Sequence, residues 1–480
     1  MQVLSVASEV YPLIKTGGLA DVTGALPGAL RTHGVKMKTL VPGYPAVTAM
    51  IEKPEQAHRF DKLFDGPATL LSGQAKGLDV FVLDAPHLYN RPGNPYLGAD
   101  GKDWPDNARR FAALSQVAFQ LARGALGNYR ADILHAHDWQ AALAAVYARH
   151  GGGPKTIVTV HNIAFQGLFP ATVFDSLNLP PQAFAIDSLE FYGNVGFLKG
   201  GLACADAITT VSPSYAEEIC TAEFGMGLEG LLRSRRSVTT GIVNGIDTSV
   251  WNPIMDAALV ARYSADNIAM RKSNKRAAEK RFGLETGDGI LHGVVSRLTW
   301  QKGMDIFASL LDWLAGTGAR LALIGTGEAA IEKAIAAAAL RHPGRIGIVT
   351  SYDEDLSHLV QGGCDTILVP SRFEPCGLTQ LYGLRYGCVP VVARTGGLAD
   401  TIVDANDAAL GAGVATGLLF SPVDGNSLQN VLVRAASLYA DHARWMAMQR
   451  QGMAADVSWD RSALKYVALY QSLAMDGRND

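Results

Sequence analysis

The chain has 480 residues, which is too long for one ordinary core and suits two domains of about 200 residues each. Hydrophobic residues make up 48% and charged residues 18%, so the chain is predicted to fold rather than to be disordered. The 42 basic and 45 acidic residues leave a net charge of −3, which excludes a general attraction to nucleic acid or to an anionic membrane.

Short apolar runs alternate with helical patterns through the first half of the chain, which is typical of parallel strands joined by helices. The predicted strands are Val3–Ser8, Met37–Val41, Val80–Leu83, Ile133–His135, Thr156–Val160 and Ala207–Val211. No basic segment with a cleavage site precedes the first run, and no apolar stretch reaches the roughly 18 residues needed to span a bilayer. The five cysteines are odd in number and lack C-x-x-C spacing, so reduced thiols are expected rather than disulfides or a zinc site. We therefore expect a cytoplasmic protein.

The second half repeats the alternation and predicts a second domain of the same kind. Its predicted strands are Leu291–Val295, Leu321–Ile324, Ile346–Val349, Thr366–Val369 and Val389–Val392. Parallel strands require helical crossovers that cover both faces of the sheet. The turn-rich segment from Asn244 to Pro253 predicts the linker, which places the domains at 1–243 and 244–457. The predicted fold class is α/β, with two doubly wound, Rossmann-like domains facing across a cleft.

One sequence occurs twice, and each copy follows a strand and opens a helix. Lys15-Thr16-Gly17-Gly18-Leu19-Ala20-Asp21 returns as Arg394-Thr395-Gly396-Gly397-Leu398-Ala399-Asp400, with six consecutive identities. Glycines at such a position let backbone N–H groups approach an anion. A Gly-Gly turn alone is weak evidence, but the cation before each turn favours an anion-binding edge in each domain.

Two further segments follow strands of the second domain. Arg297 and Lys302 come after Leu291–Val295, where a guanidinium and an ammonium suit a diphosphate leaving group, although a solvated basic loop would look the same. Glu374 and the Cys376-Gly377-Leu378-Thr379 turn come after Thr366–Val369. A carboxylate beside free backbone N–H groups can hold sugar hydroxyls while those amides face phosphate. The alternative for Glu374 is a plain acid at a helix start, and for Cys376 a packing role is favoured over a reactive thiol.

Histidine-rich segments follow two strands of the first domain. His135, His137 and Asp138 come from one segment and His161 and Asn162 from another, which favours hydrogen bonding to a sugar over a metal site. The Asp353-Glu354-Asp355 run matches the D-x-D pattern of some metal-dependent transferases, but the start of a helix is the preferred interpretation. No metal and no cofactor are expected.

Seven strings, in order and in register, resemble the bacterial glycogen synthases and plant starch synthases over essentially the whole chain. They are Lys15–Asp21, His161–Gly167, Ser212–Ala216, Asn244–Asp247, Arg297–Gly303, Ser371–Thr379 and Thr395–Asp400. The resemblance implies the GT-B architecture, with an acceptor-side N-terminal domain and a nucleotide-sugar-side C-terminal domain. It also implies that residues 458–480 form a helix, here from Trp459 to Leu473, that crosses back to the first domain.

Roles carried over from the resemblance make Arg297 and Lys302 the diphosphate clamp, with Lys15 near the donor. Glu374 would hold the glucose hydroxyls, and His161 would lie on the reacting face of the sugar. Further positions implied for the donor or substrate pocket are Gly17, Gly18, Tyr96, Asp138, Asn162, Asn244, Tyr352 (stacked on adenine), Cys376, Gly377, Leu378 and Thr379. Many related transferases have a second glutamate eight residues after the first, whereas this chain has Tyr382.

The resemblance implies transfer of glucose from ADP-glucose to the non-reducing end of glycogen or a maltooligosaccharide, with retention of configuration and release of ADP. No residue is clearly placed as a carboxylate nucleophile, which favours a front-face path. The alternatives are a GT-B enzyme that uses UDP-glucose or makes another glucan, and a non-catalytic glycan-binding protein. A nicotinamide-dependent oxidoreductase is disfavoured, because the first strand lacks a following G-x-G-x-x-G turn.

Overall fold

The computed structural model describes residues 1–351 and 353–476. The chain divides into two compact units: unit 1 combines Met1–Asn244 with the C-terminal segment from Trp459, and unit 2 is Gly245–Ser458. The chain therefore changes unit one residue after each boundary expected from the sequence. Within the described part of the chain, no helix is long and apolar enough to cross a membrane.

Unit 1 is built on a nine-stranded sheet with the order β12-β11-β7-β6-β1-β2-β5-β4-β3. Seven neighbouring strands, from β12 to β5, pair in parallel. They are β1 (Gln2–Val6), β2 (Lys36–Pro42), β5 (Leu78–Asp84), β6 (Ile133–His137), β7 (Lys155–Val160), β11 (Ala207–Thr210) and β12 (Thr239–Gly241). The chain winds outward in both directions from the β1/β6 pair, which is the point where a doubly wound sheet opens a ligand crevice.

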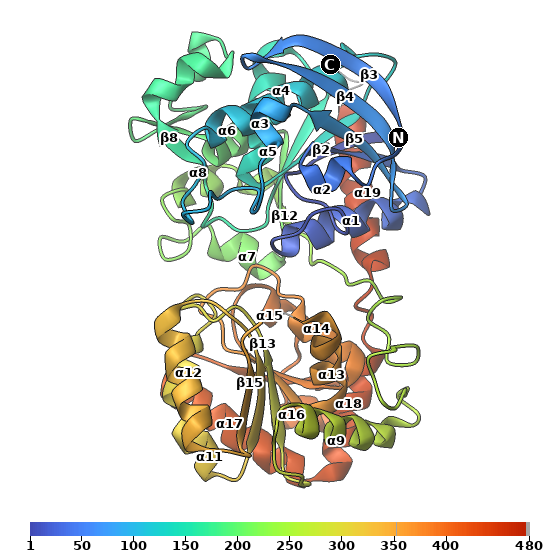
Figure 1. Ribbon diagram of the computed structural model, residues 1–480, viewed down its shortest axis with the longest axis vertical. Helices are drawn as coiled ribbons and strands as arrows, with labels where there is room; N and C mark the ends of the chain where they lie inside the picture. Colours follow the sequence, from blue (N-terminus) through green and yellow to red (C-terminus); the bar gives the residue numbers. More distant parts are fainter. Residues whose placement is uncertain (352, 477–480) are drawn as a thin grey trace. The chain divides into compact units, whose positions relative to one another are not determined.

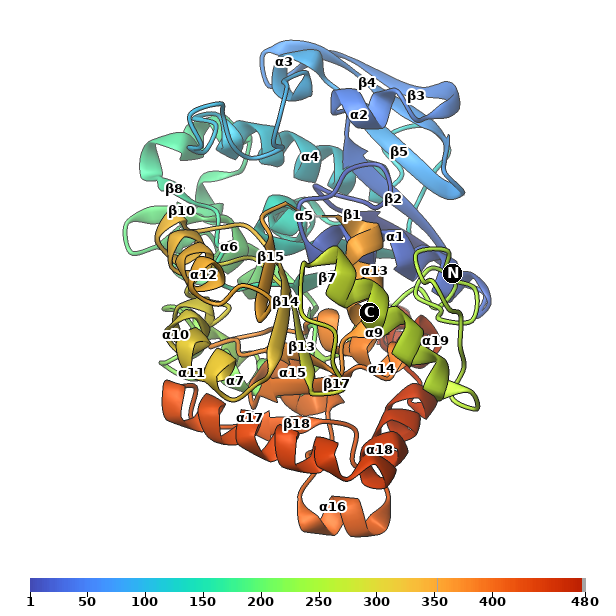
Figure 2. The ribbon, with the colours of Figure 1, turned by 60° about the horizontal axis from the view of Figure 1, so that its bottom comes forward.

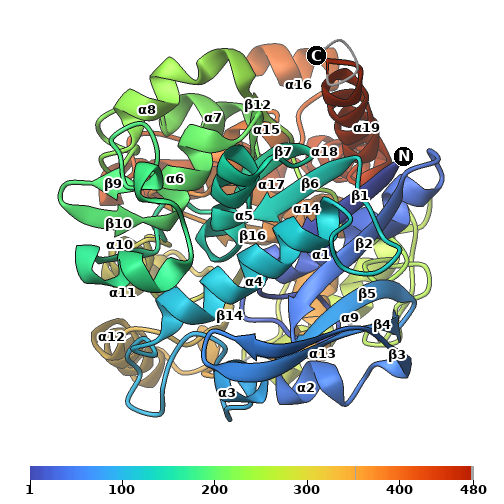
Figure 3. The same ribbon diagram turned by 90° about the horizontal axis from the view of Figure 1, so that it is seen from above.

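Two long strands at one edge of this sheet differ from the all-parallel prediction. β3 (Glu52–Leu63) and β4 (Gly66–Ala75) pair antiparallel with each other, and β4 pairs antiparallel with β5. Figure 3 shows the pair running beside β5. β3 was not predicted as a strand because it is largely polar and mostly exposed and therefore carries no apolar run. A separate small sheet orders β8 (Leu168–Pro170), β10 (Asn194–Gly196) and β9 (Glu190–Phe191).

The C-terminal helix α19 (Trp459–Asp476) belongs to unit 1 and extends three residues beyond the predicted Leu473. It packs beside α1 (Gly18–Arg31), as Figure 1 also shows. Tyr466 and Tyr470 are fully buried in one cluster with residues of β1 and α1, so α19 completes this core. The other helices of the unit are α2 (Pro45–Thr48), α3 (Pro86–Tyr89), α4 (Asn107–Ala122), α5 (Asp138–Gly151), α6 (Phe197–Cys204), α7 (Pro213–Glu218) and α8 (Glu229–Ser234).

Unit 2 has a six-stranded, wholly parallel sheet with the order β15-β14-β13-β16-β17-β18 (Figure 2). The strands are β13 (Leu291–Val295), β14 (Arg320–Ile324), β15 (Ile346–Val349), β16 (Thr366–Val369), β17 (Val389–Ala393) and β18 (Leu418–Phe420). All five strands expected from the sequence are present. Winding reverses between β13 and β16, so the crevice of this sheet is predicted to lie beyond the carboxyl ends of those two strands.

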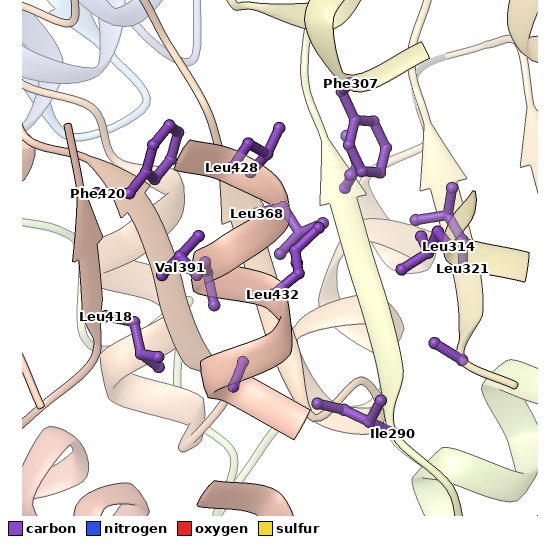
Figure 4. Close-up of a cluster of buried hydrophobic side chains, with 14 of the residues drawn as sticks. Ile290, Phe307, Leu314, Leu321, Leu368, Val391, Leu418, Phe420, Leu428 and Leu432 are labelled. Carbon is purple, nitrogen blue, oxygen red and sulfur yellow. The ribbon is translucent and has the colours of Figure 1, made fainter. Parts of the chain in front are cut away.

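Helices cover both faces of the second sheet. They are α9 (Arg271–Arg281), α10 (Met304–Ser309), α11 (Leu311–Gly316), α12 (Ala329–Arg341), α13 (Glu354–Gly363), α14 (Thr379–Tyr386), α15 (Gly396–Thr401), α16 (Asp407–Ala412), α17 (Gly425–Ala440) and α18 (His442–Ala454). Figure 4 shows Leu428 and Leu432 of α17 lying against Leu368 and Val391 of the strands. This packing of apolar side chains holds the strands in place, and the candidate site lies at their ends.

Candidate functional site

In unit 2, a cavity of about 200 Å³ lies beyond the carboxyl ends of β13 and β16. Its walls come from the loop after β13 and from the loop after β16, which leads into α14. The polar and loop residues that line it include Arg297, Lys302, Glu374, Gly377, Leu378 and Thr379. The structure therefore brings together six of the residues expected from the sequence to bind a donor.

The charged pair of this cavity is Lys302 and Glu374. Their side chains lie 2.5 Å apart, between Nζ and Oε2, and both are largely buried. The hydroxyl of Ser371 donates to the same carboxylate oxygen at 2.8 Å. These two partners fix the orientation of the carboxylate, because a buried carboxylate that turns away from them loses the interactions that compensate for its burial, which costs free energy.

Arg297 differs from Lys302 in its contacts. Its side chain lines the cavity and is exposed, and among the described residues no hydrogen bond or ion pair of its guanidinium is found. A guanidinium offers five donors in a planar fork, which matches the oxygens of a phosphate. The cavity thus holds one cation committed to a carboxylate and a second cation available to an anionic ligand.

The loop after β13 is held in place by the loop after β16. Arg372 forms a bidentate ion pair with Asp305 at 2.6 and 2.8 Å, and its guanidinium lies 4.4 Å from the ring centre of Trp300. Gly303 has φ +67°, and a Cβ there would lie 2.0 Å from the carbonyl oxygen of Pro370. The close approach therefore requires glycine and places Lys302 beside Glu374.

The turn from Glu374 to Thr379 is stabilised by hydrogen bonds from the side chain of Gln380. Gly377 has φ +71°, and Gln380 donates through Nε2 to the carbonyl oxygens of Cys376 and Gly377. Gly377, Leu378 and Thr379 line the cavity, and Thr379 opens α14, whose first backbone N–H groups have no partner within the helix itself. Cys376 is buried, in keeping with the packing role preferred for it from the sequence.

The second Thr-Gly-Gly turn does not offer the open anion-binding edge that the repeat predicted. Thr395, Gly396 and Gly397 are buried, and the N–H of Gly397 donates to the carbonyl oxygen of Glu374 at 3.0 Å. A Cβ at Gly397 would lie 2.2 Å from the carbonyl oxygen of Cys376. This expectation is wrong because a neighbouring loop covers the turn, and the turn instead supports that loop.

Unit 1 has its own group of polar residues at the carboxyl ends of β1, β6 and β7, which are neighbours in the sheet. Asp138 follows β6 with φ 54°, and its Oδ1 accepts from the backbone N–H of His161 at 2.7 Å. The Nδ1 of His137 and the Nε2 of His161 are 3.0 Å apart. A non-glycine residue held in the left-handed region often marks a functional position.

Burial sets the protonation of these groups. Burial raises the pKa of Asp138 to about 7, against the lowering effect of hydrogen bonds from the backbones of His161 and Asn162. Burial lowers the pKa of His161 to about 3 and holds the pKa of His137 well below its usual range. At neutral pH the imidazoles are therefore neutral and Asp138 is close to half-ionised.

The first Thr-Gly-Gly turn is open to solvent. Lys15, Gly17 and Gly18 are exposed, and a Cβ at either glycine would meet nothing within 4 Å. The ammonium of Lys15 pairs with Asp21 at 2.7 Å. Tyr96 reaches this region from a loop and donates from its hydroxyl to Glu9.

His135 is placed differently from the sequence interpretation, and Trp139, which follows Asp138, belongs to the core as well. His135 lies within β6, fully buried, and its two ring nitrogens contact Tyr470 Oη at 2.8 Å and Thr159 Oγ1 at 2.6 Å. Trp139 is buried against the rings of Phe111 and Phe169. Both residues therefore support the core of unit 1. No cluster of three or more metal-ligating side chains occurs among residues 1–351 and 353–476.

The side chains of Asn162, Asn244 and Asp353 take no part in the contacts described above. Asn162 is half-buried and accepts from the backbone of Ala164 in its own turn. Asn244 is buried, and its Oδ1 has no hydrogen-bond partner among the residues that the structure describes. Tyr352 lies outside the described residues. Asp353 caps α13 by accepting from Leu356 N–H, which confirms the helix-start interpretation of the D-x-D match.

Sequence reasoning missed several residues that shape these sites. Glu9 and Gln380 belong to no motif named above, and Ser371 opens one of the seven strings but was given no role. Glu9 stands just beyond the end of β1, which is the signal that could have found it. Tyr382 stands where many related transferases have a second glutamate, and it stacks on Trp251 with ring centres 3.6 Å apart. That contact joins α14 to the first segment of unit 2.

Comparisons with known proteins agree with this architecture. Residues 2–234 match the starch synthase catalytic domain, and residues 275–446 match the glycosyl transferases group 1. Glycogen synthase of Mesorhizobium japonicum is 58% identical over 475 residues, covering 98% of this chain and 99% of the relative. Glycogen synthase 1 of Rhizobium meliloti is 57% identical, covering 99% of this chain and 100% of the relative.

Solved structures extend the comparison. The catalytic domain of starch synthase IV from Arabidopsis thaliana, bound to ADP and acarbose, aligns with a TM-score of 0.87 at 31% identity, over 98% of this chain and 99% of that one. Sucrose-phosphate synthase from Thermosynechococcus elongatus shares the fold, with a TM-score of 0.58 at 17% identity over 98% of each chain.

Two doubly wound units with sites at their strand ends define a glycosyltransferase of the GT-B architecture, which confirms the predicted fold class. At 57–58% identity over nearly its whole length, the chain belongs to the glycogen synthase family. The resemblance drawn from the seven strings is thereby confirmed.

Proposed function

We propose that this enzyme transfers glucose from ADP-glucose to the non-reducing end of an α-1,4-glucan such as glycogen, with retention of configuration and release of ADP. The observation that carries the proposal is the unit 2 cavity, in which the exposed Arg297 and the Lys302–Glu374 pair face the start of α14. Such a site suits a nucleoside diphosphate attached to a polyhydroxyl group.

Each charged group of the cavity has a distinct proposed role. Arg297 and Lys302 stabilise the diphosphate as negative charge grows on it, which is where preorganised cations lower a barrier most. Glu374 accepts hydrogen bonds from glucose hydroxyls. For the residues of unit 1, the proposed roles are donor binding for Lys15 and Tyr96, contact with the sugar for His161, and an active-site carboxylate for Asp138.

The proposed chemistry is a front-face substitution. The bond between the anomeric carbon and the diphosphate oxygen breaks with its electron pair going to ADP, and the acceptor hydroxyl attacks the same face. The departing phosphate takes the acceptor proton. His161 is neutral at pH 7 because of its lowered pKa, so it serves as a hydrogen-bonding group rather than as a cation.

The deciding experiment measures nucleotide release with a glycogen primer, comparing ADP-glucose with UDP-glucose at equal concentrations. ADP released in proportion to glucan elongation supports the proposal. Preferential UDP release would favour the UDP-glucose alternative, and glucan binding without turnover of either donor would favour a non-catalytic protein. The anomeric configuration of the new linkage, measured by NMR, tests retention.

We propose further that the reaction needs no bound metal, since two cations of the protein already flank the cavity. Turnover in excess EDTA should then equal turnover with added Mg²⁺. We also infer a cytoplasmic enzyme, because the five cysteines are free thiols. Cell fractionation tests that location.

A further inference from the structure

Glu9 is a buried carboxylate that no motif singles out. It follows β1, its exposed fraction is 2%, and the structure, over its described residues, gives it no ion pair. Burying an ionised carboxylate without a cation costs free energy unless hydrogen bonds replace the lost water. The partners that supply those bonds therefore indicate what Glu9 holds in place.

Both oxygens of Glu9 are engaged, and the partners come from two different segments. Oε2 accepts from the backbone N–H of Thr16, and Oε1 accepts from the hydroxyl of Thr16 at 2.6 Å. Oε1 also accepts from the hydroxyl of Tyr96, which in turn contacts Ser8 Oγ at 2.8 Å. One side chain thus connects the turn that carries Lys15 with the loop that carries Tyr96.

The backbone of the Tyr96 loop is held by other contacts. Arg110, itself buried, donates to the carbonyl oxygens of Leu88 at 2.8 Å and Pro95 at 2.9 Å. Arg91 pairs with Asp106 across the loop. These bonds, with one from the Asn107 amide to the carbonyl oxygen of Tyr96 at 3.0 Å, hold the backbone of the loop. The Tyr96 hydroxyl, in contrast, is held by Glu9 and Ser8 after β1.

The position of Glu9 is also close to the Asp138 carboxylate. The negative charge of Glu9 adds to the effect of burial in raising the pKa of Asp138. Asp138 follows β6, the neighbour of β1 at the point where winding reverses. Glu9 and Asp138 therefore lie beyond the carboxyl ends of the two neighbouring strands at which the winding reverses.

We propose that Glu9 is a positioning residue that holds the Lys15 turn and the Tyr96 loop in one fixed arrangement, which rests on the proposed role of both in donor binding. Glu9→Ala removes all three hydrogen bonds. Glu9→Gln preserves them, because its carbonyl oxygen can accept from Thr16 N–H while its amide donates to the two hydroxyls.

Unit 1 offers a matched control in Asp206. Its Oδ2 accepts from the backbone N–H of Thr156 at 2.8 Å and from the Thr156 hydroxyl at 2.9 Å, the same pattern that Glu9 forms with Thr16. Asp206 lies before β11, at the opposite ends of the parallel strands from the candidate site. Asp206 also pairs with Lys155 at 3.2 Å in a partly exposed ion pair, whereas Glu9 has no ion pair among the described residues. Asp206→Ala therefore removes this ion pair together with the two hydrogen bonds, away from the candidate site.

The first measurement is hydrogen–deuterium exchange of the intact protein, which does not depend on any activity. Glu9→Ala should raise exchange in residues 11–20 and in residues 90–106 together, whereas Asp206→Ala should leave both segments unchanged. Faster exchange in one segment alone, or in neither, would overturn the proposed coupling.

The second measurement is steady-state kinetics with ADP-glucose and glycogen. Glu9→Ala should lower kcat/KM at least tenfold relative to Asp206→Ala at similar Tm, with Glu9→Gln recovering most of the loss. Equal kinetics for Glu9→Ala and Asp206→Ala would overturn the proposal. If the wild-type protein turns over no nucleotide sugar, the proposed function fails, and the exchange result still decides whether Glu9 couples the two segments.

Discussion

The two Thr-Gly-Gly-Leu-Ala-Asp turns have the same six residues and opposite surroundings. The turn after Lys15 is exposed, and its two glycines have open space where a side chain would stand. The turn after Arg394 is buried, and Gly397 packs against the backbone of Cys376. The first turn can approach a ligand, whereas the second supports the loop of Glu374 that lines the cavity.

A glycine pair can therefore serve two distinct purposes. Glycine permits close approach of any partner to the backbone, and the partner is either a ligand or another segment of the chain. In unit 1 the helix start is left open to solvent. In unit 2 the carbonyl oxygens of Glu374 and Pro375 already occupy the N–H of Gly397.

The largest expected effect concerns the cations of the unit 2 cavity. If the buried turn only supports the cavity, then Arg297 and Lys302 do the binding, and replacing either with Ala should lower kcat by about 10²–10³-fold. Arg297→Ala is the cleaner variant because the exposed guanidinium has no described partner in the fold. Near-normal turnover of both variants would remove the clamp from the proposed function.

A matched pair of glycine substitutions tests the comparison directly. Gly397→Ala should destabilise the protein by about 1–3 kcal/mol, because the new Cβ would lie 2.2 Å from a backbone oxygen. Gly18→Ala, at the equivalent position, should change stability by less than about 1 kcal/mol, since it meets nothing within 4 Å and lies in a helix. Urea unfolding measures both. An equal loss of unfolding free energy in the two variants would contradict the difference between the open turn and the covered turn.

The cations before the two turns should also differ in effect. Lys15→Ala should raise the KM for the nucleotide sugar about tenfold, as expected for loss of one charge-assisted hydrogen bond. Arg394→Ala should change this KM by no more than about twofold, because a surface charge away from the ligand contributes little to its binding. A larger loss for Arg394 than for Lys15 would reverse the two roles.

The last prediction concerns the pH dependence of stability in unit 1. The pKa of Asp138 is raised to about 7 in the folded state, so its contribution to stability is fully present below its unfolded pKa of about 4 and is lost as pH rises to 7. Asp138→Asn removes this dependence and should gain stability relative to wild type by about 1 kcal/mol per pH unit over that range. Asn also tolerates the left-handed backbone.

Urea unfolding of both proteins at pH 5, 6 and 7 measures the difference. The buried histidines act in the opposite direction, because their lowered pKa values reduce the stability of the fold as pH falls. Both proteins contain these histidines, so their contribution cancels in the difference in unfolding free energy. A constant difference between wild type and Asp138→Asn would show that Asp138 keeps an ordinary pKa.

The sequence by itself determined the two doubly wound units, the predicted strands of unit 2, the capping role of Asp353 and the chemical types gathered in the unit 2 cavity. Hydrophobic periodicity and composition suffice to predict these features. Buried parallel strands appear in the sequence as apolar runs, and polar residues at their carboxyl ends must meet at one edge of the sheet. The tertiary structure alone decided that β3 and β4 form an antiparallel edge, that His135 belongs to the core, that Lys302 pairs with Glu374, and that one of two identical turns is covered. Those outcomes depend on which distant segments pack together, and a local sequence pattern carries no information about its neighbours in space.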